Sequence, residues 1–96
     1  MPSTLESARA EALFVSTVQP SDLPTADEIR HAVAATLCRW RSSGCAAQVA
    51  AEFGDHPETA VARMRWALAT VRTAYARQAP VDLRSRRPRS LMLASA

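Results

Sequence analysis

The chain has 96 residues and a formal net charge of +3, with nine acidic residues and twelve basic ones that are all arginine. This length fits one domain with a single core, and no run approaches the ~20 apolar residues of a membrane-spanning helix. With only two glycines there is no glycine-rich phosphate-binding loop, and no nucleophile–base pair is evident. The sequence therefore predicts a protein that is not an enzyme and that takes no cofactor or small-molecule substrate. Its arginine and alanine bias is typical of GC-rich bacterial genomes, such as those of actinobacteria.

Residues 3–19 are predicted to form the first helix. Ser3 stands three residues before Glu6, which is the spacing of a capping box at a helix start. The apolar residues that follow do not form one narrow stripe, so this helix is expected to pack on the main body or on a second copy of the chain. It lacks a basic start and a long apolar run, so it is not a signal peptide, and we expect a cytoplasmic protein.

A turn-rich break at residues 20–25 separates this helix from the next. Thr25 and Glu28 have capping-box spacing, and the pattern predicts that the second helix ends near Ser42 and Gly44. One face of this helix collects its apolar residues: Ile29, Ala32, Val33, Thr36, Leu37 and Trp40. Trp40 is predicted to fill the space among three helices, since buried aromatic rings dominate small cores.

The two cysteines and two histidines lack the spacing of a zinc site. His31 and Cys38 lie seven residues apart on one helix, about 10 Å along its axis, which is too far to share one ion easily. Cys38 and Cys45 do not form a CxxC pair either. We therefore expect no bound metal and two reduced cysteines, with Cys45 buried as a small apolar residue.

A sharp bend is predicted at residues 54–57. A short helix ends at Phe53, and Gly54 then stands where a left-handed residue most easily closes a helix. Asp55 is expected to cap the following helix, and Pro57 to lie in its first turn. Two helices joined by so short a linker cross at a steep angle, which is the geometry of a helix-turn-helix motif.

The last predicted helix starts near Pro57 and has three distinct faces. Residues at helical spacing form its core face, namely Ala60, Met64, Ala67, Leu68, Val71, Ala74 and Tyr75. Arg65 and Arg72 lie one heptad apart on a second face, near Val61. The third strip, opposite the core, consists of Ala62, Trp66, Ala69 and Thr73. Because Trp66 would be exposed there in a lone domain, this strip is a candidate surface for a partner.

The bend and the start of the last helix resemble the helix-turn-helix of region 4 of bacterial sigma factors and of LuxR-type regulators. The family pattern of Gly, Pro, Thr, Arg, a large aliphatic residue and Ala is matched by Gly54, Pro57, Thr59, Arg63, Met64 and Ala67. The run at residues 49–53 is similar to the preceding support helix. The resemblance covers about residues 45–72 and implies DNA binding. Val61 and Ala62 are apolar where those families have polar or basic residues that face the groove.

The charge of the chain is unevenly distributed. Residues 1–58 have eight acids against four arginines, and residues 59–96 have eight arginines against one acid, so their formal charges are −4 and +7. The C-terminal tail holds a cluster of arginines: Arg84, Arg86, Arg87 and Arg89. Such a cluster is typical of a segment that contacts the phosphates of a polyanion, and its plain role is solubility in a flexible tail.

The predicted fold is an all-α bundle of three core helices that contains the helix-turn-helix. Residues 1–24 supply an N-terminal helix and a turn, residues 25–77 form the core domain, and residues 78–96 form the basic tail. The favoured function is that of a small bacterial transcription regulator whose partner is double-stranded DNA, with no membrane association.

The sequence leaves two kinds of interface open. On DNA, the groups expected to meet base edges or thymine methyls are His56, Thr59, Val61, Ala62 and Arg65. The groups expected to hold phosphates are Arg63, Arg72 and the tail arginines Arg84, Arg86, Arg87 and Arg89. The alternative is a non-enzymatic protein-interaction module that uses the strip Ala62, Trp66, Ala69 and Thr73. Its partner would be a second copy of the chain, a sigma factor, RNA polymerase or another regulator.

Overall fold

The computed structural model describes residues 3–76, and in this part of the chain the fold is all-α, as predicted. The elements are α1 (Thr4–Val15), a short 3₁₀ turn η1 (Pro20–Asp22), α2 (Ala26–Asp55) and α3 (Pro57–Tyr75). No strand occurs between residues 3 and 76.

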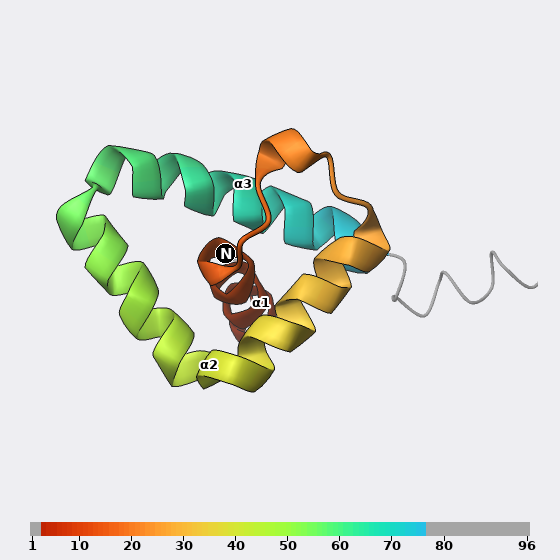
Figure 1. The fold of residues 1–96 in the computed structure, drawn as a ribbon, viewed down its shortest axis with the longest axis horizontal. Coiled ribbons are helices and arrows are strands. Elements are labelled where there is room, and N and C mark those ends of the chain that lie inside the picture. The colour runs from red at the N-terminus through yellow and green to blue at the C-terminus, as the bar shows by residue number, and fades with distance from the viewer. Residues whose placement is uncertain (1–2, 77–96) are drawn as a thin grey trace, which may run out of the picture.

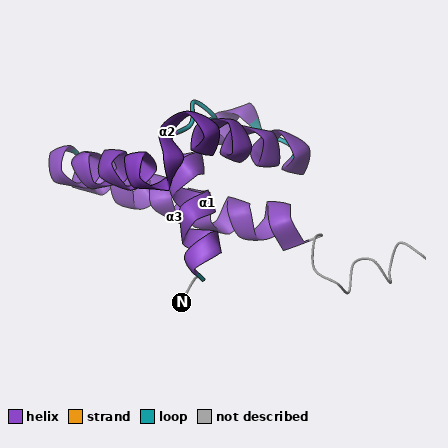
Figure 2. Cartoon of the chain, turned by 90° about the horizontal axis from the view of Figure 1, so that it is seen from below, coloured by secondary structure: helices purple, strands orange, loops and turns teal. Residues whose placement is uncertain are grey.

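Helices α2 and α3 form a triangular ring around α1. The two halves of α2 and the whole of α3 make three sides of a triangle, and α1 is seen almost end-on in its middle (Figure 1). The view from below shows α1 crossing the layer that the other two helices form (Figure 2). Leu13 of α1 is fully buried, with Ile29 of α2 and Val71 of α3 in the same core cluster. The core therefore extends across the predicted boundary at residue 24.

Side chains at the helix starts explain where α1 and α2 begin. The Oγ of Ser3 accepts a hydrogen bond from the backbone N–H of Glu6 at 3.0 Å. Thr25 and Glu28 complete a capping box, because the Thr25 hydroxyl accepts from the Glu28 N–H at 3.1 Å and the Glu28 carboxylate accepts from the Thr25 N–H at 2.8 Å. Each bond satisfies a backbone N–H that has no partner within the helix. The predicted starts of both helices are confirmed.

A kink at Arg41 divides α2 into a first half, residues 26–40, and a second half, residues 42–55. Arg41 has φ 63° and ψ 167°, a backbone conformation that non-glycine residues rarely adopt. The predicted end of the helix near Ser42 lies one residue beyond this kink. Instead of leaving the helical path for a loop, the chain changes direction at a single residue and continues as helix.

Trp40 does not fill the core, and the prediction that it does is wrong. Its side chain is 40% exposed. It lies on the apolar face of the first half of α2, but it is the last residue before the kink and borders a surface pocket together with Val15 and Val18. The centre of the core is occupied by Leu13, Ile29 and Val71 instead.

The bend between α2 and α3 consists of one residue, His56. Helix α2 continues through Gly54 and Asp55, and Gly54 does not have a positive φ. The expected left-handed glycine and the expected Asp55 cap are therefore wrong. His56 occupies the cap position, where its carbonyl accepts from the Ala60 N–H at 2.9 Å. Pro57 stands at the first position of α3 as predicted, and its ring by itself prevents α2 from continuing.

Replacing Gly54 by alanine is expected to raise the free energy of unfolding by about 0.5–1 kcal/mol. Gly54 has helical geometry, and an added Cβ would meet no atom within 4 Å. Alanine would therefore lose less conformational entropy on folding without a clash. If Gly54 lay in a left-handed turn, the same substitution would lower the free energy of unfolding, since a Cβ there costs about 1–2 kcal/mol. Urea unfolding followed by circular dichroism distinguishes the two results.

Candidate functional site

Both predicted interfaces use the side of α3 that faces away from the core. We call this side the outer face of α3, and its exposed residues are Val61, Ala62, Arg65, Ala69, Arg72 and Thr73. Val61, Arg65 and Arg72 are exposed on it, as the spacing predicts. Arg65 has no hydrogen-bond or ion-pair partner among residues 3–76. The Arg72 side chain is 55% exposed, and its Nε lies 3.2 Å from a carboxylate oxygen of Glu6 on α1. Arg65 is thus the arginine of this face whose charge is free to meet a partner.

The predicted core face of α3 is confirmed by its burial. Its fully buried members are Ala60, Ala67, Val71 and Ala74. Its partly buried members pack against the two core clusters and are Met64, Leu68 and Tyr75. The structure therefore keeps the core and outer faces of α3 separate.

The strip predicted to bind a protein partner is exposed in part. Ala62, Ala69 and Thr73 are exposed, and the Thr73 hydroxyl donates to the backbone carbonyl of Ala69 at 3.1 Å. Trp66 differs from the expectation, because it is only partly exposed and packs against the main core cluster. Its ring also lies 5.1 Å from the guanidinium carbon of Arg63. The exposed strip is consequently made of small side chains and lacks an aromatic ring that projects into solvent.

The corner that begins α3 is acidic. His56 and Thr59 are exposed there, as their predicted contact with DNA requires. The same corner also exposes three acids within seven positions, Glu52, Asp55 and Glu58. Carboxylates suit the positive end of the α3 dipole, but they repel the phosphates of a nucleic acid.

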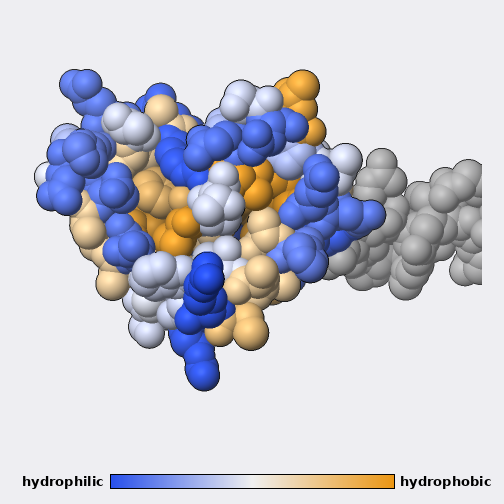
Figure 3. Space-filling view, in the orientation of Figure 1, coloured by the Kyte–Doolittle hydropathy of each residue, from blue (hydrophilic) through white to orange (hydrophobic). Residues whose placement is uncertain are grey.

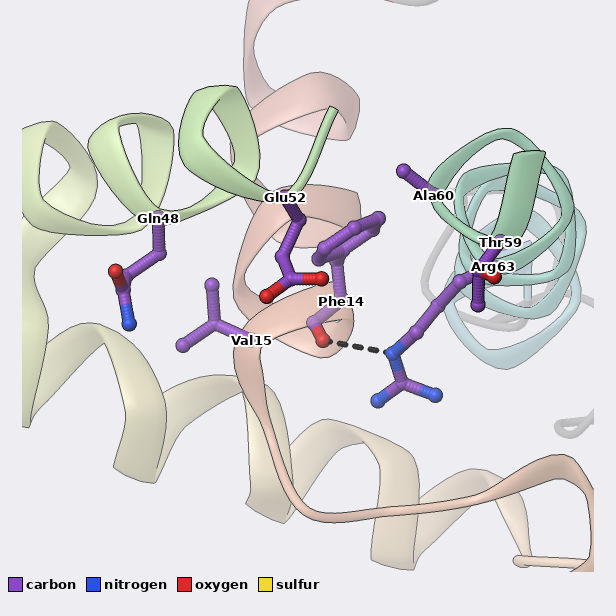
Figure 4. Close-up of a pocket in the computed structure, with 7 residues that line it drawn as sticks. All are labelled: Phe14, Val15, Gln48, Glu52, Thr59, Ala60 and Arg63. Atoms are coloured by element: carbon purple, nitrogen blue, oxygen red, sulfur yellow. Dashed lines mark hydrogen bonds between the residues drawn. The ribbon is translucent and has the colours of Figure 1, made fainter. Parts of the chain in front are cut away.

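Arg63, which is predicted to contact phosphates, has a structural role in the fold. Its side chain leaves α3 and reaches the carboxyl end of α1, where Nε donates to the carbonyl of Phe14 at 2.8 Å (Figure 4). Nη2 donates to further carbonyls at or just beyond the end of α1, those of Leu13 (3.3 Å), Ser16 (3.0 Å) and Val18 (2.9 Å). The Leu13 carbonyl also accepts from the N–H and the hydroxyl of Ser16, but among residues 3–76 the carbonyls of Phe14, Ser16 and Val18 have no partner besides Arg63, and α1 has no basic residue in its last turn. Arg63 therefore caps α1 from α3.

The surroundings of Arg63 explain why its charge is held there. Its guanidinium lies 5.9 Å from the ring of Phe14 on one helix and 5.1 Å from that of Trp66 on another. Burial lowers the pKa of Arg63, since the site withdraws water from the charge. The negative end of the α1 dipole and the two ring faces offset part of that cost.

Arg30 caps α3 in a similar way. Its Nη1 donates to the carbonyl of Ala74 at 2.6 Å, and its other arm pairs with Asp27. Arg9 lies over the ring of Tyr75, with its guanidinium carbon 3.8 Å from the ring centroid. These interactions occupy Arg9 and Arg30, two of the four arginines of residues 1–58. Sequence periodicity does not reveal them, because the partners are far apart along the chain.

The cysteines and histidines of residues 3–76 do not come together to form a metal site. Cys45 is buried as expected, and desolvation, with a smaller contribution from the charge of Glu11, raises the pKa of its thiol. Cys38 is exposed. Among residues 3–76 there is no group of three His, Cys, Asp or Glu side chains that could hold a metal ion. In the same range, no helix combines the length and apolarity needed to cross a membrane.

The arginines of the predicted tail lie outside the described residues, and so does the predicted tail itself. They are Arg84, Arg86, Arg87 and Arg89.

Comparisons of the chain with protein-family models, with curated proteins and with solved structures give no match. The resemblance to sigma factor and LuxR-type motifs therefore rests on the sequence alone.

Proposed function

We propose that this protein binds double-stranded DNA through the outer face of α3 together with the arginine-rich segment that follows it. The observation that supports this most directly is the exposure of Arg65 and Arg72 on a face to which α3 itself contributes no acidic residue from Val61 to Ala76, although Glu6 of α1 lies beside Arg72. Four further arginines come within six positions in the segment that continues from α3, at 84–89. Together these six cations are arranged along one end of the chain.

The proposed contact is made with phosphates and not with base edges. The acidic corner at Glu52, Asp55 and Glu58 disfavours entry of the first turn of α3 into the major groove, because that turn would bring carboxylates close to phosphates. Arg65 and Arg72 lie further along α3, one heptad and about 10 Å apart. Phosphate contacts of this kind position a protein on DNA but carry no sequence information directly.

Binding of the full chain to a fluorescein-labelled duplex of mixed sequence tests this proposal. If all six arginines neutralise phosphates, affinity should fall about 10³-fold between 50 and 200 mM salt, measured by fluorescence anisotropy. Arg65→Ala should weaken binding and reduce the salt slope by about one. Arg39→Ala is the matched control, since Arg39 is exposed on α2 and lies off this face. Absent binding at the lower salt, or equal effects of the two variants, would contradict the proposal.

A second candidate function is protein binding by the same face. It is favoured by the charge of residues 3–76, which contain seven arginines against eight acids and are therefore not basic. The small exposed side chains of Ala62 and Ala69 would let a partner helix approach closely beside Arg65.

With a second copy of the chain as the partner, Ala62→Arg should weaken a dimer seen by analytical ultracentrifugation. Ala51→Arg, at an exposed alanine of α2, should leave it unchanged.

A further inference from the structure

A pocket of about 210 Å³ lies where all three helices meet. Phe14 and Val15 come from the end of α1, and Gln48 and Glu52 from the last turns of α2. The α3 wall consists of Thr59, Ala60 and Arg63 (Figure 4). On the face seen in Figure 3, hydrophobic residues lie at the bottom of hollows within a hydrophilic rim. The lining of the pocket mixes the apolar side chains of Phe14, Val15 and Ala60 with the polar ones of Gln48, Glu52, Thr59 and Arg63.

Two opposite charges line this pocket without pairing with each other. Glu52 and Arg63 both belong to its wall, yet the ion pairs among residues 3–76 are Arg30–Asp27 and Arg72–Glu6. Arg63 uses Nε and Nη2 on the carbonyls of α1, and its Nη1 makes no hydrogen bond to residues 3–76. One donor arm of the guanidinium and the Glu52 carboxylate thus remain for a ligand.

The other two polar side chains of the pocket also have no hydrogen-bond partner among residues 3–76. The Gln48 amide and the Thr59 hydroxyl border the pocket, and neither forms a side-chain hydrogen bond within residues 3–76. The ring of Phe14 and the methyl groups of Val15 supply the apolar part. Its volume of about 210 Å³ lies below the ~300–1,000 Å³ of sites that hold drug-sized ligands, so the ligand is expected to be small.

We propose that this pocket binds a small free α-amino acid, with the ligand's carboxylate on Arg63 and its ammonium group on Glu52. A small zwitterion provides a partner for each of the two wall charges, whereas an anion or a cation alone would leave one of them without a partner. Among residues 3–76 no acidic side chain pairs with Arg63, so its positive charge is left for the carboxylate of a ligand. A bound ligand would join all three helices and would be independent of the outer face of α3.

Titration of the full chain with L-alanine or L-serine, followed by ¹H–¹⁵N NMR, tests the site. Saturable shifts are expected at the amides of Gln48, Glu52, Thr59 and Arg63, with a dissociation constant in the millimolar range that is usual for so small a ligand. Ethylamine and propionate each retain one of the two charges and should bind at least about tenfold more weakly than alanine. Equal binding of alanine and propionate would contradict the zwitterion site.

A pair of acid variants supplies the matched control. Glu52→Gln should weaken alanine binding by about tenfold or more and should not weaken propionate binding. Glu58→Gln removes an exposed acid that does not line the pocket and should leave both titrations unchanged. The proposal would be overturned by an absence of saturable shifts up to about 20 mM ligand, or by the same response in both variants.

Discussion

Arg63→Ala is expected to lower the free energy of unfolding by about 2–4 kcal/mol, a large part of the ~5–15 kcal/mol available to a domain. The substitution removes hydrogen bonds from a charged donor to four carbonyls at or just beyond the end of α1. It also removes the guanidinium from between the rings of Phe14 and Trp66. The carbonyls regain only part of this through water, because the site is half-buried. Urea unfolding should show the loss, and the melting temperature should fall by roughly 10–20 °C.

Arg65→Ala is the matched control for this prediction. Arg65 lies two residues further along α3, is exposed and has no partner among residues 3–76, so its loss should change the free energy of unfolding by no more than about 0.5 kcal/mol. Arg63→Lys should fall between the two, since an ammonium group keeps the charge but lacks the fork that reaches several carbonyls at once. Similar stabilities for Arg63→Ala and Arg65→Ala would show that α1 is not capped in this way.

Arg41→Gly is expected to give a protein about 1–2 kcal/mol more stable than Arg41→Ala. Arg41 has φ 63° and ψ 167°, where a Cβ is strained and glycine is not. Alanine keeps the Cβ and therefore keeps the strain, so it isolates the backbone effect from the loss of the side chain. Thermal and urea unfolding of the two variants measure the difference directly.

The control for Arg41 is the same change two residues earlier. Arg39 is also exposed but lies in the regular first half of α2, where glycine should cost about 1 kcal/mol relative to alanine. The sign of the Gly–Ala difference should therefore reverse between positions 39 and 41. The same sign at both positions would mean that α2 passes Arg41 without a kink.

Features set by neighbouring residues are the ones that the sequence predicts well. The capping spacing at Ser3 and Thr25 locates two helix starts because each cap involves only residues three positions apart. The core face of α3 follows from the period of the helix, and Pro57 fixes its first residue. These parts of the fold, with the all-α class, need no knowledge of distant contacts.

Features set by distant contacts are not predicted. Trp40 lies on the apolar face of its helix, but periodicity does not reveal that the kink at Arg41 leaves it beyond the packed core. Arg63 has the position of a family arginine, yet its acceptors lie 45 to 50 residues earlier in the chain. The candidate pocket depends on the same long-range approach of α1, α2 and α3, so only its individual residues, and not their convergence, can be read from the sequence.

The cap that α3 places on α1 has a consequence for synthesis on the ribosome. Helix α1 is made first, but the side chain that completes its carboxyl end belongs to residue 63. A nascent chain that has released only its first two helices would expose both the bare carbonyls of α1 and the apolar surface that α3 covers. Folding of this domain should therefore wait until α3 has emerged, and nascent chains stalled before that point should remain sensitive to protease.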